Sequence, residues 1–341
     1  MRRLLLWVPA ALVAVVQAVW LLRLPDRFAD LHVYRGSVLA MRHGASLYSY
    51  HAANGDPFTY PPFAGLVLYP TSWPIELGWM VLTFGAVAWC AVLVAPRWAP
   101  LACVALLLSA PVVRDLRFGQ VSLFLALLVL LDGVRRGRGI GTGVASAVKL
   151  TPLVFVPYLW LSGQRRVALT ALGTFVGCTV VGWLVLPRDS VRYWFTELWH
   201  TDRIGNLALS GNQSLNGLLL RAGVHLRFVW LGLALVVLVV GLWRASLAAR
   251  RGDPLAGIVI AGAVLVAVSP VSWTHHQIWL VFAAFCPVRR WQVVWTSAVL
   301  VVMTVPALVN LRAPLALAIA CVVPFGSVRR LEHAEADRRD G

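Results

Sequence analysis

The sequence has little charge for its length. Asp, Glu, Lys and Arg together make up 13% of the 341 residues, whereas hydrophobic residues make up 60%. Soluble domains carry about 25% charged residues, so an ordinary soluble protein is excluded. No polar stretch is long enough to bury a separate core. The sequence therefore predicts an all-α polytopic membrane protein, with one membrane domain over residues 1–327 and a short cytoplasmic tail over residues 328–341.

Cysteine pairs and clustered metal ligands are also lacking. The five cysteines lie inside apolar runs without CxxC spacing, which argues against disulfides and against a cysteine metal site. No HExxH motif occurs, and the acidic residues are not placed in an obvious group that would hold a divalent ion. We therefore expect no metal and no other cofactor.

Acidic residues are outnumbered by basic ones, 14 to 30, and the formal net charge is +16. The arginines stand in short pairs between apolar runs, not along one exposed face, so nucleic acid is not the expected partner. Anionic lipid head groups and phosphate-bearing substrates fit this pattern better.

About ten apolar runs are candidates for membrane crossings, although several are shorter than the roughly 20 residues that a straight crossing needs. They cover residues 4–22, 75–95, 99–113, 121–132, 167–186, 228–243, 255–268, 278–286, 291–309 and 315–323. Two further runs, 61–73 and 140–161, are expected to enter the membrane only halfway. The second is flanked by arginines on both sides and is interrupted at Lys149-Leu150-Thr151-Pro152, which favours a hairpin of two half-helices.

The arginine pairs also predict a topology. If the N-terminus is cytoplasmic, most arginine pairs lie inside. Asp30, residues 114–120, the loop 187–227 and residues 269–276 then share the outer side of a plasma-membrane protein.

Asp30 is the candidate catalytic residue. A carboxylate near the membrane is costly unless it has a function, and one that reaches a substrate hydroxyl can act as a general base. The structural alternative is a solvated acid beside Arg27 or Arg35.

Basic groups suited to a phosphate are the second candidate set. Lys149, the only lysine, would stand at the hairpin apex, where it has little room to reach water and must pair with an anion. His275 and His276 are adjacent and so a poor metal pair, but either can contact a phosphate; an interfacial helix cap is the alternative. Arg203 also suits a phosphate.

Polar residues suited to a sugar form a third set. Asn212 and Gln213 are neighbouring amides that suit sugar hydroxyls. Arg117 and Gln120 belong to a stretch that is either a polar turn or a set of phosphate and sugar contacts. Tyr60 lies in an aromatic and proline-rich motif that is either structural or a sugar platform.

Seven short motifs in a fixed order carry a family resemblance. They are Asp30-Leu31-His32-Val33-Tyr34, Gly44 with Leu47-Tyr48, Phe58-Thr59-Tyr60-Pro61-Pro62-Phe63, Gly119-Gln120-Val121, Lys149-Leu150-Thr151-Pro152, Asn212-Gln213-Ser214-Leu215 and Ser269-Pro270-Val271-Ser272-Trp273-Thr274-His275-His276. Through them the chain resembles the polyprenol-phosphate-mannose-dependent α-(1→2)-mannosyltransferases of glycosyltransferase family 87, which are membrane enzymes of the GT-C fold.

The resemblance implies a β-mannosyl phosphoryl polyprenol donor and a lipid-anchored mannoside acceptor, such as a phosphatidylinositol mannoside, lipomannan or lipoarabinomannan. A β-linked donor and an α-linked product imply inversion, and hence a single displacement with Asp30 as the one base. The predicted topology places this reaction on the extracytoplasmic side. The donor phosphate would be bound by Lys149, Arg203, His275, His276 and Arg117, and the sugars by Tyr34, Tyr60, Gln120, Asn212 and Gln213.

Two other functions fit parts of the pattern. A flippase or transporter of lipid-linked sugars would share the spans and the polar helix breaks, but it should show internal inverted repeats, and none is clear in this sequence. An enzyme of the same fold that uses another polyprenyl-phosphate sugar, such as arabinofuranose, would share the motifs.

Overall fold

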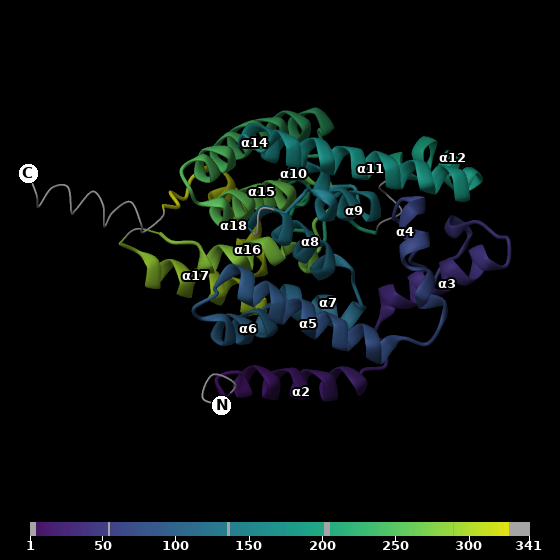
Figure 1. Cartoon of the computed structure of the whole chain (residues 1–341), viewed down its shortest axis with the longest axis horizontal. Coiled ribbons are helices and arrows are strands. Elements are labelled where there is room, and N and C mark those ends of the chain that lie inside the picture. Colours follow the sequence, from purple (N-terminus) through teal and green to yellow (C-terminus); the bar gives the residue numbers. More distant parts are fainter. Residues whose placement is uncertain (1–4, 54, 135–136, 201–204, 289, 327–341) are drawn as a thin grey trace, which may run out of the picture.

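The computed structural model describes residues 5–53, 55–134, 137–200, 205–288 and 290–326. The predicted phosphate ligand Arg203 and the predicted tail over residues 328–341 lie outside these ranges. Within them the chain is all-helical, as predicted, and its only β-type contacts are two isolated bridges. Figure 1 shows several of the longer helices, α2, α5, α11 and α14 among them, running roughly along the longest axis of the molecule.

The helix bounds are as follows. The α-helices are α2 (Val8–Leu22), α3 (Ala29–Arg42), α4 (Pro62–Val67), α5 (Glu76–Val94), α6 (Ala99–Leu108), α7 (Ala110–Phe118), α8 (Ser122–Val134), α9 (Ile140–Val148), α10 (Phe155–Leu161), α11 (Arg165–Val185), α12 (Pro187–Phe195), α13 (Leu215–Arg221), α14 (Arg227–Arg250), α15 (Pro254–Val268), α16 (Ile278–Phe282), α17 (Gln292–Thr304) and α18 (Arg312–Cys321). Short 3₁₀ segments include η1 (Leu47–Ser49), η2 (Tyr69–Ser72), η3 (Thr151–Val154), η4 (Glu197–Trp199), η6 (Thr274–Gln277) and η8 (Pro306–Leu311).

Fewer helices are long enough to cross a membrane than the apolar runs suggested. Among the described residues, only α5, α11 and α14 meet the requirements of length and apolar composition, and the number rises to five if two bent pairs each count as one span. One pair, α6 with α7, bends by 66°, and the other bends by 114° between Thr304 and Pro306. Proline explains the second bend, because it cannot continue the hydrogen bonding of a helix interior.

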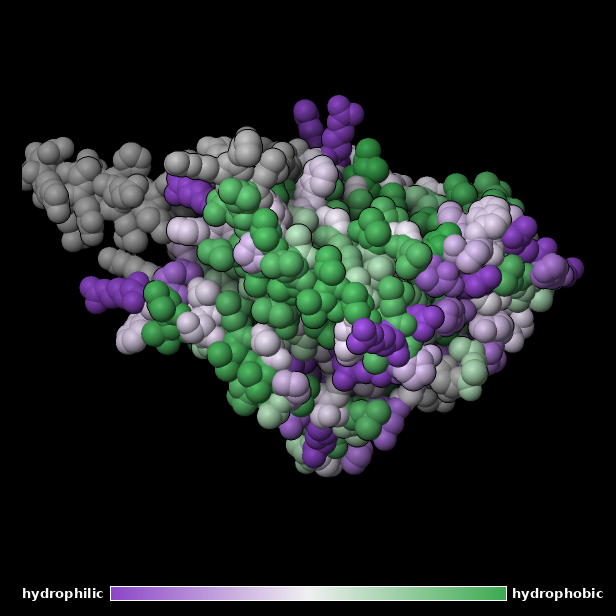
Figure 2. All heavy atoms as spheres, turned by 90° about the horizontal axis from the view of Figure 1, so that it is seen from below, coloured by the Kyte–Doolittle hydropathy of each residue, from purple (hydrophilic) through white to green (hydrophobic). Residues whose placement is uncertain are grey.

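The surface agrees with a chain that lies in a membrane. Figure 2 shows a broad hydrophobic area in the middle of one face, with hydrophilic residues gathered at its margins, many of them toward the end where α3 and α12 lie in Figure 1. Large hydrophobic side chains on α5, α11 and α14, such as Val81, Leu184 and Val239, are mostly exposed. Exposed apolar side chains on long apolar helices are expected where lipid replaces water as the surrounding solvent.

The centre of the protein is α15, in which twelve residues are buried. A helix that is apolar on all sides belongs inside a protein, and α15 packs against α14 and α18. Small residues permit close approach of its neighbours: a Cβ added at Gly262 would lie 2.4 Å from the ring of Trp279. This fixed helix leads directly into the segment 269–277, which carries the two histidines.

The predicted interruption of the run 140–161 is confirmed. The helix α9 ends at Val148, Lys149 is extended (φ −147°, ψ 127°), and the chain resumes as η3 and α10. Buried Asp132 supports the start of α9, because its carboxylate accepts hydrogen bonds from the backbone N–H groups of Gly139 and Thr142. The run 61–73, the other run expected to enter the membrane halfway, contains the short helices α4 and η2.

Candidate active site

A cavity of about 350 Å³ lies where α3, the Lys149 interruption and the segment 269–277 meet. This volume is within the range of small-molecule sites. Six residues that the sequence singled out line it, from five separate parts of the chain. They are Asp30, Tyr60, Gln120, Lys149, His275 and His276. We call this space the Lys149 cavity.

Asp30 lies in the first turn of α3, two residues after an unusual residue, Phe28. Phe28 has a left-handed backbone (φ 60°), is buried, and donates its N–H to the carbonyl of Arg117 at 2.6 Å. Non-glycine residues adopt this conformation only where the surroundings impose it, often at functional sites. The strained turn therefore fixes the start of α3, and with it Asp30, against the end of α7.

Gly119 makes the matching turn on the other chain segment. Its φ of 69° ends α7, and a Cβ at this position would lie 2.7 Å from the Cβ of Leu31 in α3. Both the backbone angle and the close contact require glycine. The turn directs the next residue, Gln120, toward Asp30.

Gln120 connects Asp30 to two buried tyrosines. The hydroxyls of Tyr34 and Tyr60 donate to Gln120 Oε1 at 3.1 and 2.9 Å, and the two hydroxyl oxygens are 3.0 Å apart. An oxygen that accepts from two tyrosines fixes the orientation of the amide. The Nε2 group consequently donates to Asp30 Oδ2. Tyr34 lies behind the cavity wall, so its contact with the cavity runs through Gln120.

The surroundings of Asp30 tune its acidity. The helix α3 is not one of the candidate spans. Enclosure by the protein raises the pKa of Asp30 to about 6, against the opposing hydrogen bond from Gln120; the charge of Asp56 raises it further and that of Lys149 lowers it. A carboxylate with this pKa is ionised near neutral pH and is still basic enough to accept a proton.

Lys149 meets His276 in the cavity lining, with Nζ 2.7 Å from Nε2. Lys149 also lies 5.1 Å from the centre of the Tyr60 ring. His276 Nδ1 accepts the backbone N–H of Trp273, so in the neutral ring the proton belongs on Nε2 and faces the lysine. The 2.7 Å distance leaves no room for an atom between the two nitrogens, but an anion beside the pair can accept from the remaining N–H groups of Lys149.

His275 is the second histidine of the cavity. Its ring packs edge-on against Phe118, and its buried Nδ1 has no hydrogen-bond partner within the described ranges. Burial lowers the pKa of both imidazoles well below their usual range, and the charge of Lys149 adds to this effect. Both histidines therefore act as neutral hydrogen-bonding groups and not as cations.

Three further residues singled out by the sequence lie away from the cavity. Asn212 accepts the N–H groups of Ser214 and Ser272. Gln213 accepts the N–H of Ala313 and donates to the carbonyl of Ser210. These amides fasten the loop around residue 212 to the segment 269–277 and to α18. Arg117 forms an ion pair with Asp26 on the outside of the protein.

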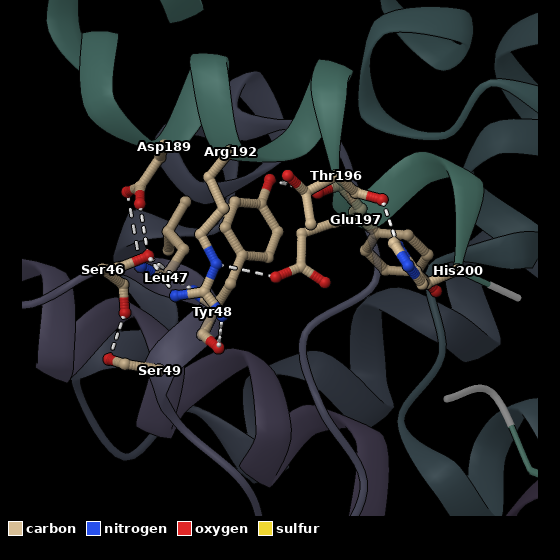
Figure 3. Close-up of polar contacts among 10 residues, drawn as sticks. Ser46, Leu47, Tyr48, Ser49, Asp189, Arg192, Thr196, Glu197 and His200 are labelled. Carbon is tan, nitrogen blue, oxygen red and sulfur yellow. Dashed lines mark hydrogen bonds and ion pairs between the residues drawn. The ribbon is translucent and has the colours of Figure 1, made fainter. Parts of the chain in front are cut away.

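One wall of the cavity is held by a polar contact between α12 and η1 (Figure 3). Asp189 accepts from the hydroxyl of Ser46 at 2.5 Å and from the N–H of Leu47 at 3.3 Å. Arg192 donates to the carbonyl of Tyr48 at 3.1 Å and to Glu197 at 2.7 Å. These bonds set the position of α12 and η4, from which Tyr193 and Glu197 reach the cavity.

Sequence reasoning did not select three residues that the structure adds to the cavity wall, Asp56, Trp273 and Glu197. Asp56 and Trp273 each stand within or beside a motif, and this was the available signal. Nothing in the sequence near Glu197 indicates its position. Within the part of the chain that the structure describes, no group of three or more His, Cys, Asp or Glu residues is placed to hold a metal ion.

A comparison with known protein families gives a match to the part of the chain that contains several of these cavity residues. The model of glycosyltransferase family 87 matches residues 58–270, more than half of the chain. This chain belongs to glycosyltransferase family 87. The family match includes Gln120 and Lys149, while Asp30 and the two histidines lie outside it in sequence and join the cavity through the fold.

Curated relatives are similar over most of the chain. A polyprenol-phosphate-mannose-dependent α-(1-2)-phosphatidylinositol mannoside mannosyltransferase of Mycobacterium tuberculosis is 34% identical over 316 residues, covering 81% of this chain and 74% of the relative. A protein of the same name from Mycolicibacterium smegmatis is 33% identical, covering 81% and 73%. A relative from Mycobacterium tuberculosis named for phosphatidylinositol pentamannoside is 34% identical, covering 74% and 64%. No solved structure gives a significant match.

Proposed function

We propose that this family 87 glycosyltransferase transfers mannose from a polyprenyl phosphomannose donor to a phosphatidylinositol mannoside, with inversion and formation of an α-(1→2) linkage. We place the reaction on the extracytoplasmic side of the plasma membrane, in a GT-C fold with more crossings than the three to five that helix length alone supports. The names of the relatives support the substrates. The observation that carries the proposal is one cavity lined both by the carboxylate of Asp30 and by the Lys149–His276 pair.

The geometry suits a single displacement. Asp30 would take the proton of the acceptor hydroxyl as the hydroxyl oxygen attacks the anomeric carbon. The bond from that carbon to the phosphate oxygen breaks at the same time, and polyprenyl phosphate leaves with the electron pair. Lys149 and His276 would donate to this phosphate, and such fixed donors act most strongly where water is excluded.

The lipid part of the donor also has a place. A mainly apolar groove of about 450 Å³ is lined by Trp199, Leu220 and Trp230 among others, and it shares Leu198 and Pro270 with the Lys149 cavity. A polyprenyl chain that lay in this groove would bring its phosphate to the cavity. An apolar groove next to the cavity that holds the phosphate donors favours a lipid-linked donor over a nucleotide sugar.

The substitution Asp30→Asn tests the proposal. The amide keeps the shape of the side chain but cannot accept the proton, so we expect the variant to fold and insert while transfer falls by at least about 100-fold. Transfer is measured in membranes with radiolabelled polyprenyl phosphomannose, and the linkage of the product is determined.

Asp26→Asn serves as the matched control, because Asp26 is an exposed acid in the same connection and does not line the cavity. It should retain transfer. Full transfer by Asp30→Asn would refute the role of Asp30, and a wild-type protein that transfers no mannose would refute the proposed function.

A further inference from the structure

A second hollow of about 370 Å³ lies beside the Lys149 cavity. Asp30, Asp56, Trp273 and His275 line both spaces. Residues of α7 line only the second, so we call it the Arg114 hollow; the α7 members are Arg114 and Phe118. Asp30 thus borders both spaces.

The lining of the Arg114 hollow suits a neutral sugar. Arg114 is exposed, lies 5.8 Å from the centre of the Phe118 ring, and has no ion pair or hydrogen bond with any residue in the described ranges. Guanidinium and carboxylate groups together supply the donors and acceptors that sugar hydroxyls need. The rings of Phe118 and Trp273 offer apolar surface to the C–H face of a pyranose.

The hydrogen-bond donors of the two spaces differ. Lys149 and His276, the pair suited to a phosphate, line only the Lys149 cavity, and Arg114 lines only the Arg114 hollow. Asp30 and Asp56 line both spaces and Glu197 adds a carboxylate to the Lys149 cavity, so the donors and not the carboxylates distinguish the two. A hydroxyl group that enters from the Arg114 hollow reaches Asp30 without passing the donor.

We propose that the Arg114 hollow binds the non-reducing mannose residue of the acceptor, with Arg114 and Phe118 as residues that determine acceptor affinity. This inference rests on the proposed function and places the two substrates on opposite sides of Asp30.

Arg114→Gln and Phe118→Leu test the assignment. Transfer is measured with polyprenyl phosphomannose as the donor and octyl α-mannoside as the acceptor, varying each in turn. Loss of one charged hydrogen bond predicts an increase of about tenfold in the KM for octyl α-mannoside in Arg114→Gln. The KM for the donor should stay within about twofold of the wild-type value in both variants, because the phosphate ligands are on the other side.

Arg23→Gln is the control for a lost positive charge. Arg23 is exposed at the end of α2 and lines neither space, so this variant should keep both KM values. A second readout, equilibrium binding of octyl α-mannoside to the purified full chain without donor, should weaken about tenfold in Arg114→Gln.

The binding measurement separates two kinds of failure. If the wild type binds octyl α-mannoside through Arg114 but transfers no mannose, the proposed function fails and the assignment of the hollow stands. If the wild type transfers mannose and Arg114→Gln raises the donor KM, or leaves the acceptor KM and the binding of octyl α-mannoside unchanged, the assignment of the hollow is overturned.

Discussion

Replacing Gln120 by methionine should raise the pKa of Asp30, the proposed base, and leave its carboxyl group in place. Methionine has a similar length but no N–H, so Asp30 loses the hydrogen bond that favours its ionised form. The two tyrosines lose a common acceptor, yet their hydroxyl oxygens are already 3.0 Å apart and can bond to one another. We therefore expect the variant to fold, with its main effect on the protonation of Asp30.

The size of the effect follows from the bond that is lost. A hydrogen bond to a charged group contributes about 1.5–3 kcal/mol. Asp30 borders a cavity that water can enter, so the lower value applies, and it corresponds to about one pKa unit. The pKa of Asp30 would rise from about 6 to about 7. Because the base must be ionised, kcat/KM falls as pH falls through the pKa of Asp30, and the loss should begin about one pH unit higher in the variant.

The assay is the pH dependence of kcat/KM for mannose transfer between about pH 5 and pH 9, the range that brackets both values. Wild type and Gln120→Met should reach similar rates at high pH and differ about fivefold near pH 6. Tyr34→Phe should cause a smaller shift in the same direction, since it removes only one of the two hydroxyls that orient the amide. A profile that is unchanged in Gln120→Met would refute the account of how Asp30 is tuned.

Two further substitutions test the contact of Gly119 with α3 and the lipid groove. Gly119→Ala should lower the unfolding free energy by at least about 2 kcal/mol, because alanine at φ 69° is strained and its Cβ meets Leu31. Thermal unfolding in detergent should show this loss, whereas the control Gly78→Ala, where nothing lies within 4 Å, should unfold at the wild-type temperature or above. Equal destabilisation of both variants would contradict the argument. Leu220→Trp should narrow the groove and lower kcat/KM for a long-chain polyprenyl phosphomannose about tenfold, with little effect on a ten-carbon analogue. The control is Val236→Trp, on the exposed side of α14. If Leu220→Trp lowered kcat/KM equally for both donors, the lipid would lie elsewhere.

The features that the sequence predicted well depend on composition and on local breaks. The scarcity of charged residues predicts helices in a membrane, because a helix pairs its own backbone N–H and C=O groups in lipid, where water cannot. The sequence Lys149-Leu150-Thr151-Pro152 predicts the end of α9, since Pro152 has no N–H to donate to the carbonyl of Val148, four residues earlier. The expected ten crossings stay a prediction, because three helices, or five with the bent pairs, are long and apolar enough. An apolar run does not reveal bends within it: the run 99–113 contains the 66° bend between α6 and α7.

Side-chain roles were harder to predict than positions. Gln120, Asn212 and Gln213 are all amides in polar stretches, and the sequence suggested sugar contacts for each. In the structure only Gln120 faces the cavity, while the other two are occupied by backbone groups. The difference lies in which loops pack together, and this depends on contacts between residues that are far apart in sequence.

The arrangement also answers a problem that the reaction itself creates. A donor phosphate is an anion, and an anion close to Asp30 would raise the pKa of this carboxyl and so protonate the base when it is needed. The structure opposes this in two ways. Gln120 donates to Asp30 whether or not the donor is bound, and its orientation is set by two buried tyrosines. The charge of Lys149 also lowers the pKa of Asp30, and the N–H groups of Lys149 and His276 would stabilise the charge of the phosphate. Lys149 would therefore act on the base and on the phosphate at the same time.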